Sequence, residues 1–310
     1  MNEGAALRKL LGRMPKKGAL RVRRVGEVDA DDHVREDVLL SDGSGMSIPT
    51  YVLVPKDLSG KAPGVVAIHQ HGGQFHLGRS EPAGLAGDPD SHYGLELVRR
   101  GYVVAVPDLL CFESRRPPDL RDAPPDKLAG VAYERFEFSR AILVGSTLQA
   151  RYLSDLTTVV DYLRSRPDVI ASRIGAIGHS LGGQQVCYLM LYDKRVCAGV
   201  CSCGIGTWRT ILADGVIHNF ASYMPGMLLV GDTDVLLPGI APRHLFISAG
   251  EDDGIFPVRG VRALGRAMRA RYRERGAADA FKLVVSPGGH GFPPQVRAMA
   301  YEHIDSRLRM

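Results

Sequence analysis

Short apolar runs recur along the whole chain, and Gly, Pro or Asp bounds most of them. The first two, residues 34–40 and 47–54, alternate apolar with polar side chains, a pattern typical of antiparallel strands with one wet face. The later runs are almost continuously apolar, which is typical of parallel strands covered on both faces. They lie at 64–70, 102–108, 173–178, 197–202, 244–250 and 281–287. We therefore predict a mostly parallel sheet of eight strands.

Amphipathic stretches separate the later runs. In the clearest of them, residues 147–165, apolar side chains recur at helical spacing from Leu148 to Leu163. We expect further helices at 91–100, 181–192, 259–275 and 294–308. Strands that alternate with helices indicate right-handed βαβ units, so the fold class is α/β, with a doubly wound sheet and helices on both faces.

Two stretches depart from this alternation, at 109–140 and 204–242. Both follow strand carboxyl ends, where open α/β sheets bind ligands, and we interpret them as loops and short helices that roof a pocket. The chain of 310 residues is then one α/β domain over 34–310. A basic segment, helical or extended, precedes it at 1–33.

Composition and charge favour an ordinary globular protein, with 45% hydrophobic and 24% charged residues. The net charge is +5, and residues 8–24 hold eight Lys or Arg and no acid. Without a helix-turn-helix, zinc-finger spacing or aromatic-basic interleaving, we expect neither a nucleic-acid nor a membrane partner, while a homo-oligomer is left open. No signal peptide or membrane-length apolar run is visible, which favours the cytoplasm. The five cysteines are then buried reduced thiols.

The strongest chemical signal is Gly178-His179-Ser180-Leu181-Gly182, a G-x-S-x-G pattern between a predicted strand and a predicted helix. A sharp turn there lifts Ser180 above the sheet, and side chains at the two glycines would collide. A serine hydroxyl needs a base to act as a nucleophile. An acid and then a histidine should therefore follow Ser180 along the chain. Asp253 and His290 do so, each after a strand.

These motifs resemble those of the α/β-hydrolases, in particular the dienelactone hydrolase and acetyl-xylan-esterase-like branch, over roughly residues 34–303. Residues 178–183 and 287–292 carry the likeness. The family's acid stands in a G-x-x-D-x-x-x-P pattern, which selects Asp253, between Gly250 and Pro257, with Asp252 as the alternative. Dienelactone hydrolase itself uses a cysteine nucleophile, whereas this chain has Ser180.

The resemblance implies that His290 takes the Ser180 proton and that Asp253 orients the imidazole. The oxyanion would be bound by the Leu181 amide and by an amide of the loop HQHGGQFH, residues 69–76, at Gly73 or Gln74.

The three histidines of that loop, His69, His71 and His76, also suit a metal site. A metallohydrolase would leave the serine, acid and histidine without a purpose, so we expect no metal and no cofactor. We predict a serine hydrolase of carboxylic esters with a small to medium acyl group. The alternatives are a thioesterase or acyltransferase on the same triad, a binding protein, or a metal-dependent hydrolase. Candidate pocket residues are His71, His179, Phe112, Arg115, Trp208, Tyr223 and Met224.

Overall fold

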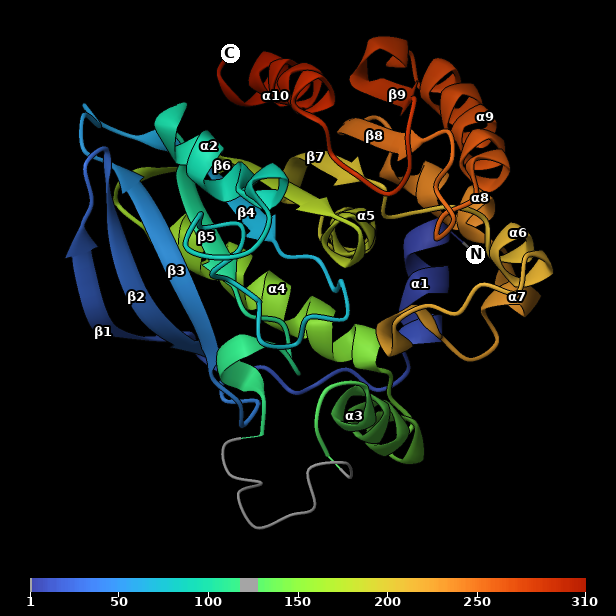
Figure 1. The fold of residues 1–310 in the computed structure, drawn as a ribbon, viewed down its shortest axis with the longest axis horizontal. Coiled ribbons are helices and arrows are strands. Elements are labelled where there is room, and N and C mark those ends of the chain that lie inside the picture. The colour runs from blue at the N-terminus through green and yellow to red at the C-terminus, as the bar shows by residue number, and fades with distance from the viewer. Residues whose placement is uncertain (1, 118–127) are drawn as a thin grey trace.

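The computed structural model describes residues 2–117 and 128–310, and one mixed β-sheet runs through its middle (Figure 1). The strands are β1 (Arg21–Asp29), β2 (His33–Ser41), β3 (Ile48–Pro55), β4 (Ala62–Ile68), β5 (Val103–Pro107), β6 (Val169–His179), β7 (Val196–Ser202), β8 (His244–Gly250) and β9 (Phe281–Ser286). Their order across the sheet is β1-β2-β3-β5-β4-β6-β7-β8-β9.

The sheet is parallel where the sequence runs are continuously apolar. The pairs β1–β2, β2–β3 and β3–β5 are antiparallel, and all pairs from β5 to β9 are parallel. Every residue of β4, β5 and β7 is buried, as expected for strands with helices on both sides. The predicted α/β class and the mostly parallel sheet are confirmed.

The predicted number of strands is wrong, because the described residues already form a sheet of nine strands and not eight. The additional strand, β1, falls in the basic segment at 1–33 and pairs with β2 along its length. All nine of its residues are exposed. An edge strand that buries no side chain leaves no alternation in the sequence, so hydrophobic periodicity could not reveal it.

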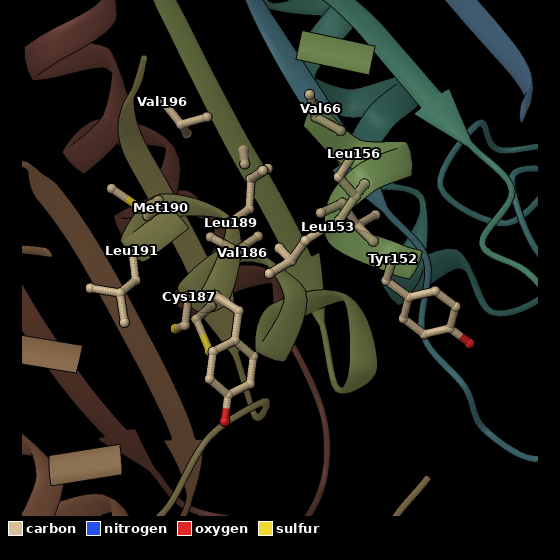
Figure 2. Close-up of a cluster of buried hydrophobic side chains, with 14 of the residues drawn as sticks. Val66, Tyr152, Leu153, Leu156, Val186, Cys187, Leu189, Met190, Leu191 and Val196 are labelled. Carbon is tan, nitrogen blue, oxygen red and sulfur yellow. The ribbon is translucent and has the colours of Figure 1, made fainter. Parts of the chain in front are cut away.

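Helices cover the sheet on two sides and form two separate hydrophobic clusters. One side carries α4 (Leu148–Ser165), α5 (Leu181–Tyr192), α9 (Val258–Glu274) and the N-terminal α1 (Glu3–Leu11). The other side carries α2 (Tyr93–Arg99) and α10 (Pro294–Leu308). Figure 2 shows side chains of α4 and α5 over the sheet, with Leu153 and Leu156 of α4 on the side of Val186, and Met190 of α5 on the side of Val196. Every residue of α5 except Tyr192 is buried. This helix therefore gives rigid support to Ser180, which directly precedes it.

The two insertions are partly helical. The first contains η2 (Glu113–Arg115) and α3 (Val131–Leu143), and its residues 118–127 lie outside the described part of the chain. The second contains α6 (Trp208–Ala213), η3 (Phe220–Ser222), α7 (Met227–Val230), α8 (Thr233–Leu236) and η4 (Leu237–Ile240). The remaining short helices are η1 (Pro89–Ser91) and η5 (Ala278–Ala280). None of the helices within 2–117 and 128–310 is long and apolar enough to cross a membrane.

Candidate active site

Ser180 stands on the turn between β6 and α5 in a left-handed backbone conformation, with φ 53° and ψ −119°. Such angles are costly for a residue with a side chain, so the surroundings must hold them. The Ser180 N–H donates to the Ser202 carbonyl at 2.8 Å, and the Ser180 carbonyl accepts from the Gln184 N–H at 3.0 Å. Two neighbouring elements therefore fix the strained turn.

The glycines around Ser180 are required by close backbone contacts. A Cβ atom on Gly178 would lie 2.3 Å from the Gly182 carbonyl carbon, and one on Gly182 would lie 2.0 Å from the Ile68 carbonyl oxygen. No side chain fits at either position. The contact with Ile68 also places the end of β4, and the loop that follows it, directly beside the turn.

Asp253 and His290 meet at the carboxyl ends of β8 and β9. His290 Nδ1 lies 2.8 Å from Asp253 Oδ2, and Asp253 Oδ1 accepts the backbone N–H groups of Ile255 at 2.8 Å and Phe256 at 3.0 Å. Burial acts to raise the pKa of Asp253, but the hydrogen bond and charge of His290 and the two amides outweigh it, and the pKa falls below its ordinary value. Asp252, the alternative acid, is exposed. The carboxylate that contacts His290 is therefore that of Asp253.

The His290 imidazole lies against the residue that precedes the nucleophile candidate. The ring centroids of His179 and His290 are 4.9 Å apart, and His179 Nδ1 is 3.1 Å from Ser202 Oγ. Burial and the nearby His290 lower the pKa of His179 to about 3, so this ring stays neutral and serves as packing. No hydrogen bond joins the Ser180 and His290 side chains in the part of the chain that the structure describes; such contacts commonly form only with substrate bound.

The sequence suggested the backbone amides of Gly73 and Gln74 as oxyanion donors, and both are already hydrogen-bonded within the loop after β4. Gly72 and Gly73 have φ values of 51° and 70°, and this left-handed turn directs the Gln74 N–H to the His71 carbonyl at 3.0 Å. The Gly73 N–H donates to His71 Nδ1 at 3.1 Å. The His71 amide itself has no hydrogen-bond partner among the described residues. Leu181, the other predicted donor, is the first residue of α5, so its N–H has no partner within the helix.

The imidazoles of His69 and His71 both use their two nitrogens for hydrogen bonds. His69 Nδ1 contacts the Gln70 carbonyl at 2.7 Å and Nε2 accepts the Leu109 N–H at 3.1 Å, while burial lowers its pKa to about 4. Since Gly73 donates to Nδ1 of His71, Nε2 carries the proton and donates to Glu134 Oε2 at 3.1 Å. Neither ring has a lone pair left for a metal in this arrangement, and His76 is exposed.

One other group within the described residues has the right atoms for a metal: Cys203, Asp253 and His290 offer ligand atoms within 4.8 Å of one another. Burial raises the pKa of the Cys203 thiol to about 12, and its Sγ lies 3.2 Å from the Gly291 carbonyl. A protonated thiol is a poor ligand, and the other two side chains already bond to each other. This group fits an acid–base pair with a packed thiol better than a metal centre.

The candidate pocket residues separate into two sets. Trp208, Tyr223 and Met224 line a largely apolar cavity of about 450 Å³ between the second insertion and Phe138 of α3. The Arg115 guanidinium instead forms a buried ion pair with Asp155 at 2.7 Å.

Phe112 is fully buried, and its ring stacks on Phe75 with centroids 5.0 Å apart. It also contacts the ring of His71. Phe112 therefore supports the loop and does not line the apolar cavity. A second cavity, of about 580 Å³, borders the loop at Gly73, Phe75 and His76.

Two residues that the sequence gave no reason to select connect the insertions to this site. Glu134 is buried, and its Oε1 also accepts the Phe220 N–H at 3.2 Å. His218 lies 2.9 Å from the Ile255 carbonyl and packs against Phe256 and Trp208, and burial lowers its pKa to about 4. A glutamate on a helix and a histidine in a long loop normally face solvent, so no sequence signal distinguished them.

A serine with a positive φ, between a central parallel strand and a buried helix, is characteristic of the α/β-hydrolases. The fold and the site therefore place the protein in that class. The model of the dienelactone hydrolase family matches residues 48–303. The chain belongs to this family and is a hydrolase.

A relative agrees with this assignment, and two solved structures share the fold. YtaP of Bacillus subtilis (strain 168) is 29% identical over 288 residues, which cover 91% of each chain. The fold is similar to a glucuronoyl esterase from Solibacter usitatus, with a TM-score of 0.69, 14% identity and 98% of this chain and 91% of that chain covered. It is also similar to acetyl xylan esterase 1 from Thermoanaerobacterium sp. JW/SL YS485, with a TM-score of 0.64, 14% identity and coverages of 97% and 92%.

Proposed function

We propose that the protein hydrolyses carboxylic esters through Ser180, His290 and Asp253. The observation that carries this proposal is the His290–Asp253 hydrogen bond beside a serine held in a left-handed turn. Hydrogen bonds to Ser202 and Gln184 hold Ser180 in its strained backbone conformation. A serine with only a structural role would not need a conformation that costs free energy. The esterase names of the two solved structures support an ester as the substrate.

In the proposed reaction, His290 Nε2 takes the Ser180 proton as Oγ attacks the ester carbonyl. The Asp253 carboxylate holds Nδ1–H, which fixes the tautomer and stabilises the imidazolium. Collapse of the tetrahedral intermediate releases the alcohol, which receives the proton from His290, and leaves an acyl group on Ser180. Water activated by the same imidazole then hydrolyses the acyl-enzyme.

The oxyanion in this proposal is bound by the N–H groups of Leu181 and His71. Leu181 begins the buried helix α5, whose dipole adds to the stabilisation of a negative charge. His71 is preferred to Gly73 and Gln74 because their amides are bonded within the loop. A small to medium acyl group is part of this proposal. The cavity of about 580 Å³ beside the loop does not set that size, because neither Ser180 nor His290 lines it.

The test is covalent labelling with a fluorophosphonate, followed by mapping of the modified peptide. We expect label on Ser180 in the wild-type protein and none in Ser180→Ala. The same variant should lose p-nitrophenyl acetate hydrolysis by roughly five to six orders of magnitude, the scale found when a triad serine is removed. Label on another residue, or a variant that keeps more than about 1% of the rate, would exclude Ser180 as nucleophile.

A further inference from the structure

Strand β1 forms one edge of the sheet, and its outer side has no neighbour in the described part of the chain. Within residues 2–117 and 128–310 its only strand partner is β2, and all nine residues of β1 are exposed. Val22, Val25 and Val28 remain 48%, 45% and 46% exposed. In Figure 1, β1 lies at the left rim of the molecule, away from the helices. A strand with no buried side chain gains little from the core of its own subunit.

Proteins usually protect such an edge. Common devices are a very short strand, a proline, a bulge and charged side chains. Strand β1 is nine residues long and has no proline, but it has a bulge and five charged side chains. The bulge makes Val25 an extra residue between the pairs Arg24–Val38 and Gly26–Asp37. It twists the strand locally, and the outward N–H and C=O groups before and after it stay free to pair. The edge is therefore long, partly apolar and able to pair.

The charges of β1 are ordered along its length. Arg21, Arg23 and Arg24 occupy its first half, and Glu27 and Asp29 occupy its second half. When two such strands pair antiparallel about Val25, the basic half of each faces the acidic half of the other. Parallel pairing would set like charges side by side.

The ion pairs that these charges form within the subunit are exposed or long. Asp29 pairs with Lys56 at 2.7 Å in an exposed contact, and Arg24 lies 3.9 Å from Glu36. Arg21 and Arg23 form no ion pair among the described residues. Glu27 pairs with Arg24 in an exposed contact, and exposed pairs of this kind contribute little and exchange readily.

We propose that β1 is a homodimer interface, in which β1 of one subunit pairs antiparallel with β1 of a second copy. Backbone hydrogen bonds then extend one sheet through both subunits, and the three valines gain contacts across the junction. Because the same edge is used twice about a two-fold axis, the assembly closes as a dimer and does not grow into fibres. A second copy is the occupant that fits because the charge pattern is complementary to itself.

The interface is remote from the proposed catalytic residues. Strand β6, which leads to Ser180, lies five positions from β1 in the sheet, or about 24 Å at the usual strand spacing of about 4.8 Å. Dimerisation through β1 therefore neither depends on the proposed function nor completes its site. Substitutions on β1 should leave turnover unchanged, which separates a failure of this inference from a failure of the proposed function.

Two charge variants test the proposal by sedimentation equilibrium and light scattering. Arg21→Glu combined with Arg23→Glu and Arg24→Glu makes the strand wholly acidic, and Glu27→Arg combined with Asp29→Arg makes it wholly basic. We expect the wild-type protein to have twice the mass of one chain, and each variant alone to have the mass of one chain. An equimolar mixture of the two variants should recover the doubled mass, because each then meets its complement.

Amide hydrogen exchange of the wild-type protein gives a second measurement that needs no variant. Peptides covering β1 should become more protected as protein concentration rises, while peptides covering β9 should not change. A wild-type protein that stays monomeric at high concentration, or a dimer that survives both charge variants, would overturn the proposal. So would β1 peptides whose protection does not change over the concentration range in which the mass rises from one chain to two.

Discussion

Nε2 of His71 donates a hydrogen bond to Oε2 of Glu134 at 3.1 Å, and this contact connects the loop after β4 to helix α3 of the first insertion. The other oxygen of Glu134 accepts the Phe220 N–H of the second insertion. One buried carboxylate thus holds three segments that are far apart in the sequence. The residue it holds, His71, is the one whose own amide we assign to the oxyanion.

Replacing Glu134 by Gln should lower kcat by roughly tenfold to a hundredfold with little change in KM. The amide cannot accept both hydrogen bonds, and an unsatisfied buried group costs about 1 to 3 kcal/mol, which would loosen the placement of His71. The matched control is Glu137→Gln, one turn further along α3, where the buried carboxylate pairs with Arg140 and does not touch the loop. Equal losses in the two variants would argue against a positioning role for Glu134.

Asp253→Asn should reduce turnover by roughly four orders of magnitude, because the amide favours the wrong tautomer of His290. Asp252→Asn should have little effect, since Asp252 is exposed and only Asp253 contacts His290. Steady-state kinetics of both purified variants, with melting temperatures as the check on folding, make the comparison. The reverse order of effects would transfer the acid role to Asp252.

Gly73→Val should lower turnover by roughly two orders of magnitude, near the cost of one missing oxyanion donor. A Cβ atom there meets nothing within 4 Å, so the damage comes from the left-handed φ of 70°, which valine resists. Relaxing the turn would displace His71. Gly276→Val is the control, since Gly276 has a φ of 64°, open space and no contact with the site. It should lose stability but keep its activity per folded molecule.

Activity should survive EDTA and phenanthroline, and elemental analysis should find no stoichiometric zinc, iron or manganese. The reason is that both ring nitrogens of His69 and of His71 are used in hydrogen bonds within the protein. Loss of activity on chelation with recovery on added metal would make these histidines ligands and would refute the proposed oxyanion loop.

The free energy of unfolding should fall as the pH drops from about 6.5 to about 4. Burial lowers the pKa of His69 and His218 to about 4, and burial together with His290 lowers that of His179 to about 3, so the unfolded chain binds more protons than the folded chain in this window. Burial also lowers the pKa of His303 to about 4 and that of His244 below its ordinary value. Asp108, whose pKa burial raises to about 6, and Glu81, whose pKa burial also raises, act in the opposite direction, but they are two groups against five. Urea midpoints across the window measure the slope, and a flat profile would contradict the prediction.

Much of the fold was predictable because the parallel strands and their helices bury continuous or periodic apolar faces. Strand β1 was not, since every residue on it is exposed and its pattern carries no trace of a core. Helix α1 was equally hidden in a segment whose basic residues dominate, although Ala6, Leu7, Leu10 and Leu11 are buried. Periodicity reports burial, and elements that bury little give little signal.

The site could be predicted where backbone geometry restricts the sequence. Gly178 and Gly182 are needed near Ser180 because any side chain there would collide with backbone atoms, and this constraint can be recognised in the sequence. The role of Glu134 was not visible, because its partner His71 is 63 positions away and nothing local to α3 marks a carboxylate that turns inward.

The order of the strands has a consequence for the chain during its synthesis. The strained turn at Ser180 can form once β6, β7 and α5 have been made, but Asp253 and His290 arrive with β8 and β9, the last two strands. Until β9 and the residues after it have been made, a nascent chain on the ribosome therefore holds Ser180 without the histidine that the proposed mechanism requires. In the proposed mechanism, ester cleavage begins only when β9 has left the ribosome and joined β8 in the sheet, so the folding of this part of the chain switches the enzyme on.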